Sequence, residues 1–196
     1  LDLFNSTVQT GWGTRRLSEV CDRAFASVAV DPATGLVQCD AEEGRTRVDW
    51  GFCDSIRKSG LCLMPSLLRW EAAIELAQLF ENNGNSAAAA SYRHAAERIQ
   101  SALGPTFARE LPPVGGVNCS LLCSATGLGR KDDVWASAYA VWLRVLPHDL
   151  ELAVAHHLLD LYRKGGTVKD GQVRHLPPNG DWGGYWEEAE SERGKY

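Results

Sequence analysis

The chain has 196 residues, of which 44% are hydrophobic and 23% charged, as expected for a globular domain with a core. Its formal net charge is −5, and lysine and arginine are scattered along it, which argues against a nucleic-acid partner. No apolar run approaches the roughly 18 residues that a membrane-spanning helix needs, and nothing at the start resembles a signal peptide.

The chain begins with Leu1, and its only methionine is Met64. We therefore expect residues 1–196 to be a single domain that is an internal piece of a longer protein. This expectation leaves the localisation open, because a targeting segment can lie outside the piece.

The first predicted element is a helix over residues 15–29. A second helix is predicted to begin at Pro65, because proline suits the first turn of a helix, where its missing N–H is not needed. Asn83-Gly84 is expected to end it, since glycine readily adopts the left-handed conformation that closes a helix. Apolar residues at helical spacing predict its buried face: Leu68, Ala72, Leu76 and Leu79.

A third helix is predicted from Ser86 to about Leu103. The connection before it is so short that the two helices are expected to form an antiparallel hairpin. Its expected buried face contains five residues at helical spacing: Tyr92, Ala95, Ala96, Ile99 and Leu103.

A second hairpin is predicted further along the chain. Asp132 and Asp133 mark a helix start, where carboxylates cap the free amides and offset the helix dipole. This helix is expected to run to Pro147, and the next one from Asp149 to Gly165. A row of aromatic side chains on the first of these helices is expected to lie in the core: Trp135, Tyr139 and Trp142.

Long segments separate the hairpins: residues 31–60, 104–131 and 165–196. Structureless loops longer than about 12–15 residues are uncommon unless they are functional. All three are rich in tryptophan, glycine or carboxylates. The sequence therefore predicts an all-α domain of antiparallel helical hairpins, built as a helical toroid with long loops around a cleft at one end.

The six cysteines do not indicate a metal site: Cys21, Cys39, Cys53, Cys62, Cys119 and Cys123. The nearest spacing, Cys119 to Cys123, has no second close pair beside it, so free thiols are expected and structural zinc is not. His156 and His157 lack a third ligand at suitable spacing. No glycine motif for a nucleotide is present, so no cofactor is expected.

Three stretches of the chain, by their order and spacing, resemble the six-hairpin glycosidases. They are residues 48–60 (VDWGFCDSIRKSG), 132–143 (DDVWASAYAVWL) and 171–187 (GQVRHLPPNGDWGGYWE). The resemblance covers roughly residues 45–190. It implies part of an (α/α)6 toroid, a carbohydrate partner and a missing N-terminal half. Because a partial toroid leaves apolar helix faces exposed, the piece is expected to associate with itself, to need that half, or to be marginally stable.

Hydrolysis of a glycosidic bond usually needs one carboxyl group as acid and a second one as base or nucleophile. The resemblance implies an inverting reaction. The candidate catalytic residues are Asp49, Asp54, Asp133 and Glu187. The alternatives are a helix cap for Asp54 or Asp133 and a solvated acidic patch for Glu187.

Candidate substrate-binding residues lie in the same loops. Trp50, Trp182 and Trp186 are flanked by glycine or other aromatics and can stack on sugar rings. If residues 172–175 are extended, Gln172 and Arg174 point one way and could hold hydroxyl groups. His175 could bind substrate as well, or be packed and satisfied inside the structure.

Two other functions fit parts of the sequence. A polysaccharide lyase or sugar epimerase on the same toroid would rely on a tyrosine or histidine base, and then Tyr185 and His175 would matter most. A non-catalytic helical-repeat scaffold is suggested by residues 76–103, which resemble one tetratricopeptide unit. Such arrays repeat about every 34 residues with short connections, unlike this chain.

Overall fold

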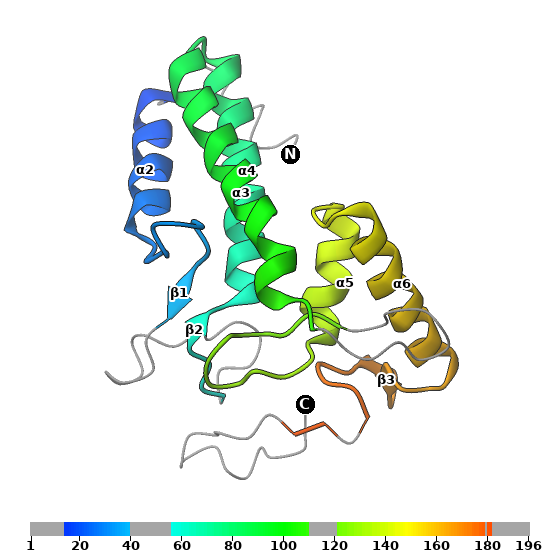
Figure 1. Ribbon diagram of the computed structural model, residues 1–196. Helices are drawn as coiled ribbons and strands as arrows, with labels where there is room; N and C mark the ends of the chain where they lie inside the picture. The colour runs from blue at the N-terminus through cyan, green and yellow to red at the C-terminus, as the bar shows by residue number, and fades with distance from the viewer. Residues whose placement is uncertain (1–13, 40–55, 110–120, 179, 182–196) are drawn as a thin grey trace.

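The computed structural model describes residues 14–39, 56–109, 121–178 and 180–181. These residues are mostly helical, which confirms the all-α class (Figure 1). In chain order the elements are α2 (Thr14–Ser27), β1 (Gln38–Cys39), β2 (Gly60–Leu61), α3 (Leu63–Asn82), α4 (Ser86–Phe107), α5 (Val134–Leu143), α6 (His148–Arg163), β3 (Val168–Lys169) and β4 (Gln172–Val173).

The helices α3 and α4 form the first predicted hairpin. Gly84 has a φ of +72°, so the turn uses glycine as expected. The side chain of Asn85 then caps α4 by accepting from the amide of Ala88 at 3.1 Å. Arg93 and Glu81 form an exposed ion pair of 2.8 Å across the hairpin.

The helix α4 runs past the predicted end at Leu103 to Phe107, with Pro105 inside it. Proline removes only one intrahelical hydrogen bond here, and Phe107 is fully buried, so packing favours the extra turn. At Gly104 an added Cβ would lie 3.2 Å from the side chain of Leu150, so the missing side chain lets α6 approach α4 closely.

The helices α5 and α6 form the second hairpin. The prediction that α5 runs to Pro147 was wrong, because it ends at Leu143 and Arg144 adopts a left-handed φ of 53°. This reversal turns Val145 and Leu146 into the core, where they are buried. Pro147 instead precedes α6, whose first turn carries two acidic residues that suit the helix dipole.

One core cluster joins both hairpins and the loops beneath them. Its buried residues include Leu36, Leu63, Leu67, Ile99, Leu103, Phe107, Leu122, Ala140, Val145 and Val154. The predicted face of α4 is largely confirmed, but Leu68 of α3 is exposed and the neighbouring Leu67 is buried in its place. Trp142 is 70% exposed, so placing it in the core was wrong, whereas Trp135 and Tyr139 pack partly against this cluster.

The helix α2 lies along the first hairpin at its end far from the β-strands (Figure 1). Arg69 of α3 donates to the carbonyl oxygen of Phe25 at 2.6 Å, and its guanidinium lies 3.6 Å from the centre of the Phe25 ring. The hydroxyl of Tyr92 donates to Asp22. These contacts attach α2 to the first hairpin.

The described parts of the three long segments gather at one end of the hairpins, as the sequence predicts (Figure 1). We call residues 30–39, 56–62, 121–133, 166–178 and 180–181 the base. Within it β1 pairs antiparallel with β2, and the backbones of Cys62 and Ala125 form an isolated antiparallel β-bridge. Backbone bonds from Leu63 to Ser124 and from Asp133 to Leu122 attach the starts of α3 and α5 to one loop.

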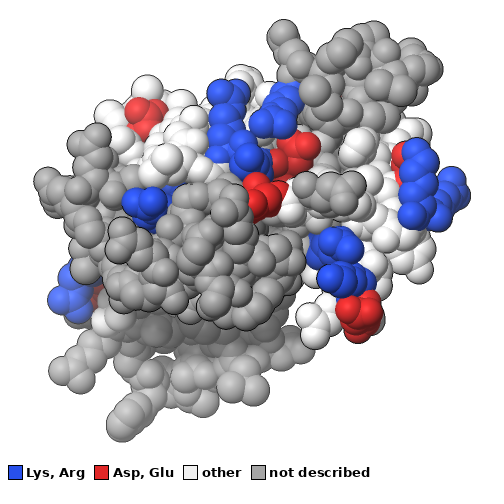
Figure 2. Space-filling view, turned by 90° about the horizontal axis from the view of Figure 1, so that it is seen from below, with Lys and Arg blue, Asp and Glu red and all other residues white. Residues whose placement is uncertain are grey.

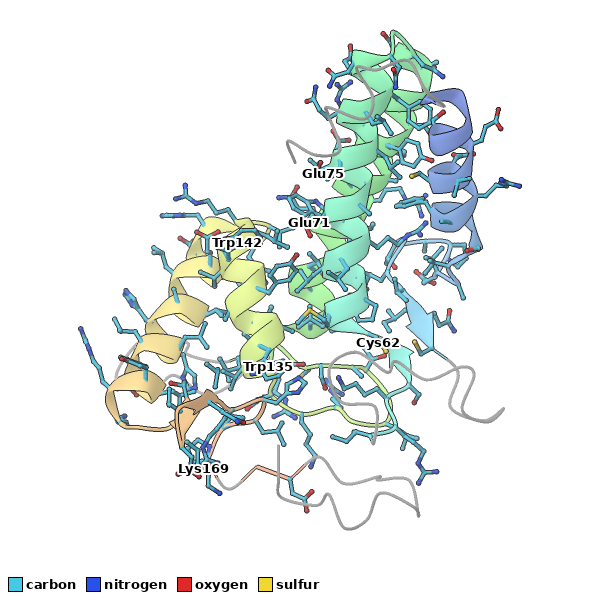
Figure 3. All side chains as sticks on the ribbon, turned by 180° about the vertical axis from the view of Figure 1, so that it is seen from behind. Cys62, Glu71, Glu75, Trp135, Trp142 and Lys169 are labelled. Atoms are coloured by element: carbon cyan, nitrogen blue, oxygen red, sulfur yellow. The ribbon has the colours of Figure 1, made fainter. Side chains whose placement is uncertain are left out.

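The two hairpins meet near the base and diverge away from it (Figures 1 and 3). Tyr139 of α5 donates a hydrogen bond of 2.5 Å to Glu71 of α3, which ties them together. Among the described residues, Cys21 and Cys123 are free thiols. None of the described helices has the length and apolar character needed to span a membrane.

Candidate functional site

A buried Asp–His pair lies where the base meets α5. Asp133 is fully buried and His175 is 3% exposed. The Nε2 atom of His175 lies 3.3 Å from each carboxylate oxygen of Asp133. Asp133 also caps α5, because its Oδ1 accepts from the amide of Ala136 at 2.8 Å. The carboxylate is therefore held from two sides.

Trp135 completes the contact between α5 and the segment of His175. Its indole ring stacks on the imidazole, with the centroids 4.5 Å apart and the planes at 7°. The indole Nε1 donates to the carbonyl oxygen of Val173 at 3.2 Å. The amide of Val134 donates to the carbonyl oxygen of His175 at 2.9 Å. Residues 173–175 are thus fixed on the first turn of α5.

The adjacent carboxylate, Asp132, has a different environment. It is partly exposed and lies 3.1 Å from Nη1 of Arg109. Asp133 faces inward, and Asp132 lines a pocket on the outside of the base.

This pocket has a volume of about 340 Å³ and combines charged and apolar walls. We call it the base pocket. Its lining residues are Arg109, Arg130, Lys131, Asp132, Leu176, Pro177, Pro178, Gly180 and Asp181. Because Asp132 and Leu176 directly neighbour Asp133 and His175 in the chain, the base pocket adjoins the buried pair.

Most of the predicted site residues lie outside the residues that the structure describes: Asp49, Trp50, Asp54, Trp182, Trp186 and Glu187. The same holds for Tyr185 of the alternative function. Their roles as catalytic or sugar-binding groups stay predictions, and so does the catalytic role of Asp133.

Of the described candidates, Gln172 is exposed on β4 and Arg174 is partly buried. The amide of Arg174 donates to Thr167 at 2.8 Å, while its Nε atom is buried without a hydrogen-bond partner among the described residues. His175 takes the packed and satisfied alternative. Gln172 and Arg174 were expected to point the same way, but their side chains are not equally exposed.

Several residues that the structure brings to the base had no recognisable signal in the sequence. Lys58 is 1% exposed, although lysine side chains are almost never fully buried. A Cβ added at Gly129 would lie 2.9 Å from Cγ of Lys58, so the lysine stem packs against the loop before α5. Arg109, Arg130 and Asp181 were missed because they are far apart in sequence and match no motif.

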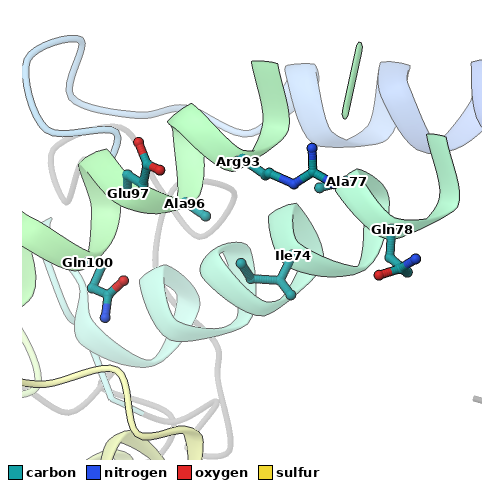
Figure 4. Close-up of a pocket in the computed structure, with 7 residues that line it drawn as sticks. All are labelled: Ile74, Ala77, Gln78, Arg93, Ala96, Glu97 and Gln100. Carbon is teal, nitrogen blue, oxygen red and sulfur yellow. The ribbon is translucent and has the colours of Figure 1, made fainter. Parts of the chain in front are cut away.

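A further hollow lies between α3 and α4, away from the base (Figure 4). It has a volume of about 300 Å³ and is lined by Ile74, Ala77, Gln78, Arg93, Ala96, Glu97 and Gln100. Of these residues, Arg93 forms the ion pair with Glu81. In the part of the chain that the structure describes, no three His, Cys, Asp or Glu side chains are grouped to hold a metal ion.

No protein-family model matches this sequence, and neither does any curated protein or solved structure.

Proposed function

We propose that this chain is a piece of an (α/α)6 toroid that hydrolyses glycosidic bonds, with its substrate site at the base. The observation that carries the proposal is the gathering of the described loop residues at the end where α3 and α5 begin. Both helices begin beside residues 122–124 and lead away from the base, and α4 and α6 return toward it (Figure 1). This alternation is the one expected within a toroid of helical hairpins.

The resemblance of residues 45–190 to six-hairpin glycosidases supplies the reaction. The acid and the base are proposed from Asp49, Asp54 and Glu187. A buried carboxylate held by a helix amide and an imidazole is poorly placed to exchange protons with a substrate, so Asp133 is assigned a positioning role. Through His175 it fixes the segment that leads into the predicted aromatic loop.

Within this proposal, Trp50, Trp182 and Trp186 stack on sugar rings, and Gln172 and Arg174 hold hydroxyl groups. The protein binds a carbohydrate and needs no cofactor. The long connection between α4 and α5, from Ala108 to Asp133, argues for this toroid over the repeat scaffold, because repeat arrays use short connections.

The test is hydrolysis of a panel of oligosaccharides by the full chain, with the anomeric configuration of the product followed by NMR. Inversion is expected. Asp54→Asn and Glu187→Gln should each lower kcat by about 10²–10⁴-fold, as loss of a general acid or base does. Asp160→Asn, an exposed change on α6, is the matched control and should leave kcat unchanged.

Two results would count against hydrolysis. An unsaturated or epimerised product that survives Glu187→Gln would favour the lyase or epimerase. Absence of binding to any glycan, together with capture of a specific protein, would favour the scaffold.

A further inference from the structure

The base pocket differs in charge from the molecule around it. Three cationic side chains line it, from Arg109, Arg130 and Lys131, and two anionic ones, from Asp132 and Asp181. The lining therefore has one positive charge in excess, whereas the whole chain has a formal charge of −5. Figure 2 views the base from below and shows basic side chains gathered around acidic ones.

Arg109 is positioned by its neighbours on the loop before α5. It pairs with Asp132 at 3.1 Å and donates to the carbonyl oxygen of Arg130 at 3.4 Å. Asp132 is thereby neutralised within the pocket wall. Arg130 and Lys131 are exposed, and within the described residues neither side chain takes part in an ion pair.

The turn that carries Arg130 and Lys131 is rigidly built. Gly129 has a φ of +69°, which favours glycine. Its carbonyl oxygen accepts from the hydroxyl of Ser124 and from the amide of Lys131. The amide of Ser124 in turn donates to the carbonyl oxygen of Lys131 at 2.8 Å. The two cationic residues therefore stand on a backbone that is already ordered before a ligand arrives.

Another part of the pocket lining is apolar. Leu176 is buried, and Pro177 and Pro178 follow it. Gly180 donates its amide to the carbonyl oxygen of Pro177 at 3.0 Å and closes the turn. A Cβ at Gly180 would lie 2.9 Å from Cβ of Leu176, so the turn packs tightly. An apolar surface of this kind suits the face of a sugar ring that presents C–H groups.

We infer that the base pocket binds an acidic saccharide, with the Arg130 and Lys131 side chains on its carboxylate, sulfate or phosphate group and its ring against Pro177 and Pro178. Arginine is the usual partner of such planar or tetrahedral oxyanions, and lysine adds a mobile point charge. The inference rests on the proposed function for the sugar part of the ligand. The acidic group of the ligand is inferred from the residues of the base pocket alone.

The test measures dissociation constants of the full chain for matched oligosaccharides: neutral ones, uronic-acid ones, sulfated ones and phosphorylated ones. Inorganic sulfate and phosphate are measured beside them. The double variant Arg130→Gln/Lys131→Gln removes both exposed charges at surface positions. Lys169→Gln, an exposed change on β3 outside the pocket, is the matched control (Figure 3).

We expect one acidic class to bind at least about tenfold tighter than its neutral counterpart, as one charge-assisted hydrogen bond allows. The double variant should lose this preference, and Lys169→Gln should keep it. Raising the ionic strength from low to physiological should weaken the binding of the acidic saccharide more than that of its neutral counterpart. Comparison of the three acidic classes identifies the oxyanion.

Two outcomes overturn the inference and separate it from the proposed function. If neutral and acidic saccharides bind equally and the double variant matches wild type, the charge preference is wrong while the carbohydrate site stands. If inorganic sulfate or phosphate binds but no saccharide does, the pocket is a simple anion site and the proposed function fails as well.

Discussion

The indole of Trp135 and the imidazole of His175 lie face to face, 4.5 Å apart, and each ring is anchored at a second point. The indole donates to Val173, and the imidazole contacts the carboxylate of Asp133. The start of α5 and the segment that follows β4 are therefore joined by a stacked pair of rings, a buried contact between an imidazole and a carboxylate, and hydrogen bonds to backbone carbonyl groups. This junction holds one wall of the base pocket in place.

His175→Ala should lower the free energy of unfolding by about 1–3 kcal/mol, because it leaves a buried carboxylate short of a partner. Urea denaturation followed by circular dichroism measures the change. Gln172→Ala in the same segment is the matched control, since Gln172 is exposed, and it should stay within about 0.5 kcal/mol of wild type. Equal effects of the two changes would show that the pair does not stabilise the junction.

Stability above pH 10 should depend on Tyr139. Burial of the hydroxyl and its hydrogen bond to Glu71 raise the pKa of Tyr139 from its ordinary value of 10.0 to about 12, and burial is the larger cause. The folded state thus binds the proton more tightly than the unfolded state does. The stabilisation is complete below pH 10 and is lost as the pH rises from about 10 through 12.

In Tyr139→Phe this part of the alkaline loss should disappear, at a cost of about 1 kcal/mol at neutral pH for the lost hydrogen bond. Urea denaturation at a series of pH values gives both quantities. Tyr162→Phe is the control, because Tyr162 is 63% exposed. An unchanged alkaline slope in Tyr139→Phe would rule out the proposed contribution.

Gly60→Ala should destabilise the base more than Gly84→Ala destabilises the first hairpin. Both glycines have a positive φ, of 76° and 72°, so both changes carry a backbone cost of about 1–2 kcal/mol. An added Cβ at Gly60 would also lie 2.4 Å from Oγ1 of Thr126, whereas nothing lies within 4 Å at Gly84. The crowding should add about 1–3 kcal/mol in thermal or urea denaturation. Equal losses would mean that the loops separate without cost.

Trp142→Ala should cost about 1 kcal/mol or less, because the side chain is 70% exposed and loses mainly its stacking on Tyr139, 5.5 Å away. Phe107→Ala should cost about 3–5 kcal/mol, because Phe107 is fully buried in the main core. Denaturation of both variants under the same conditions provides the comparison. A loss at Trp142 as large as that at Phe107 would indicate that another surface covers it.

Local signals in the sequence predicted the helices well. Helical spacing, Asn83-Gly84 and the paired aspartates located both hairpins to within a few residues. The end of α5 was misplaced because Pro147 is a stronger sequence signal than Arg144. Arg144 adopts a left-handed conformation, which lets Val145 and Leu146 reach the core. Trp142 was misplaced because helical spacing identifies a shared face and not what covers that face.

The site was less predictable, because its contacts join residues far apart in sequence. Nothing in the run RKSG indicates that Lys58 is buried, and nothing near Arg109 indicates its pairing with Asp132. Nothing in the sequence indicates that Asp133, and not Asp132, lies buried beside His175. Such pairings follow from tertiary packing, which local spacing does not encode.

The base also has a consequence for the order of folding. Ser59 and Leu128 are joined by two hydrogen bonds, and the whole α3–α4 hairpin lies between them in the chain. Closing that loop costs chain entropy before any base contact compensates for it. The hairpins depend on near neighbours and can form early, whereas the base has a high contact order and should form late. The part of the molecule that carries the pocket is therefore the part whose assembly limits the folding rate.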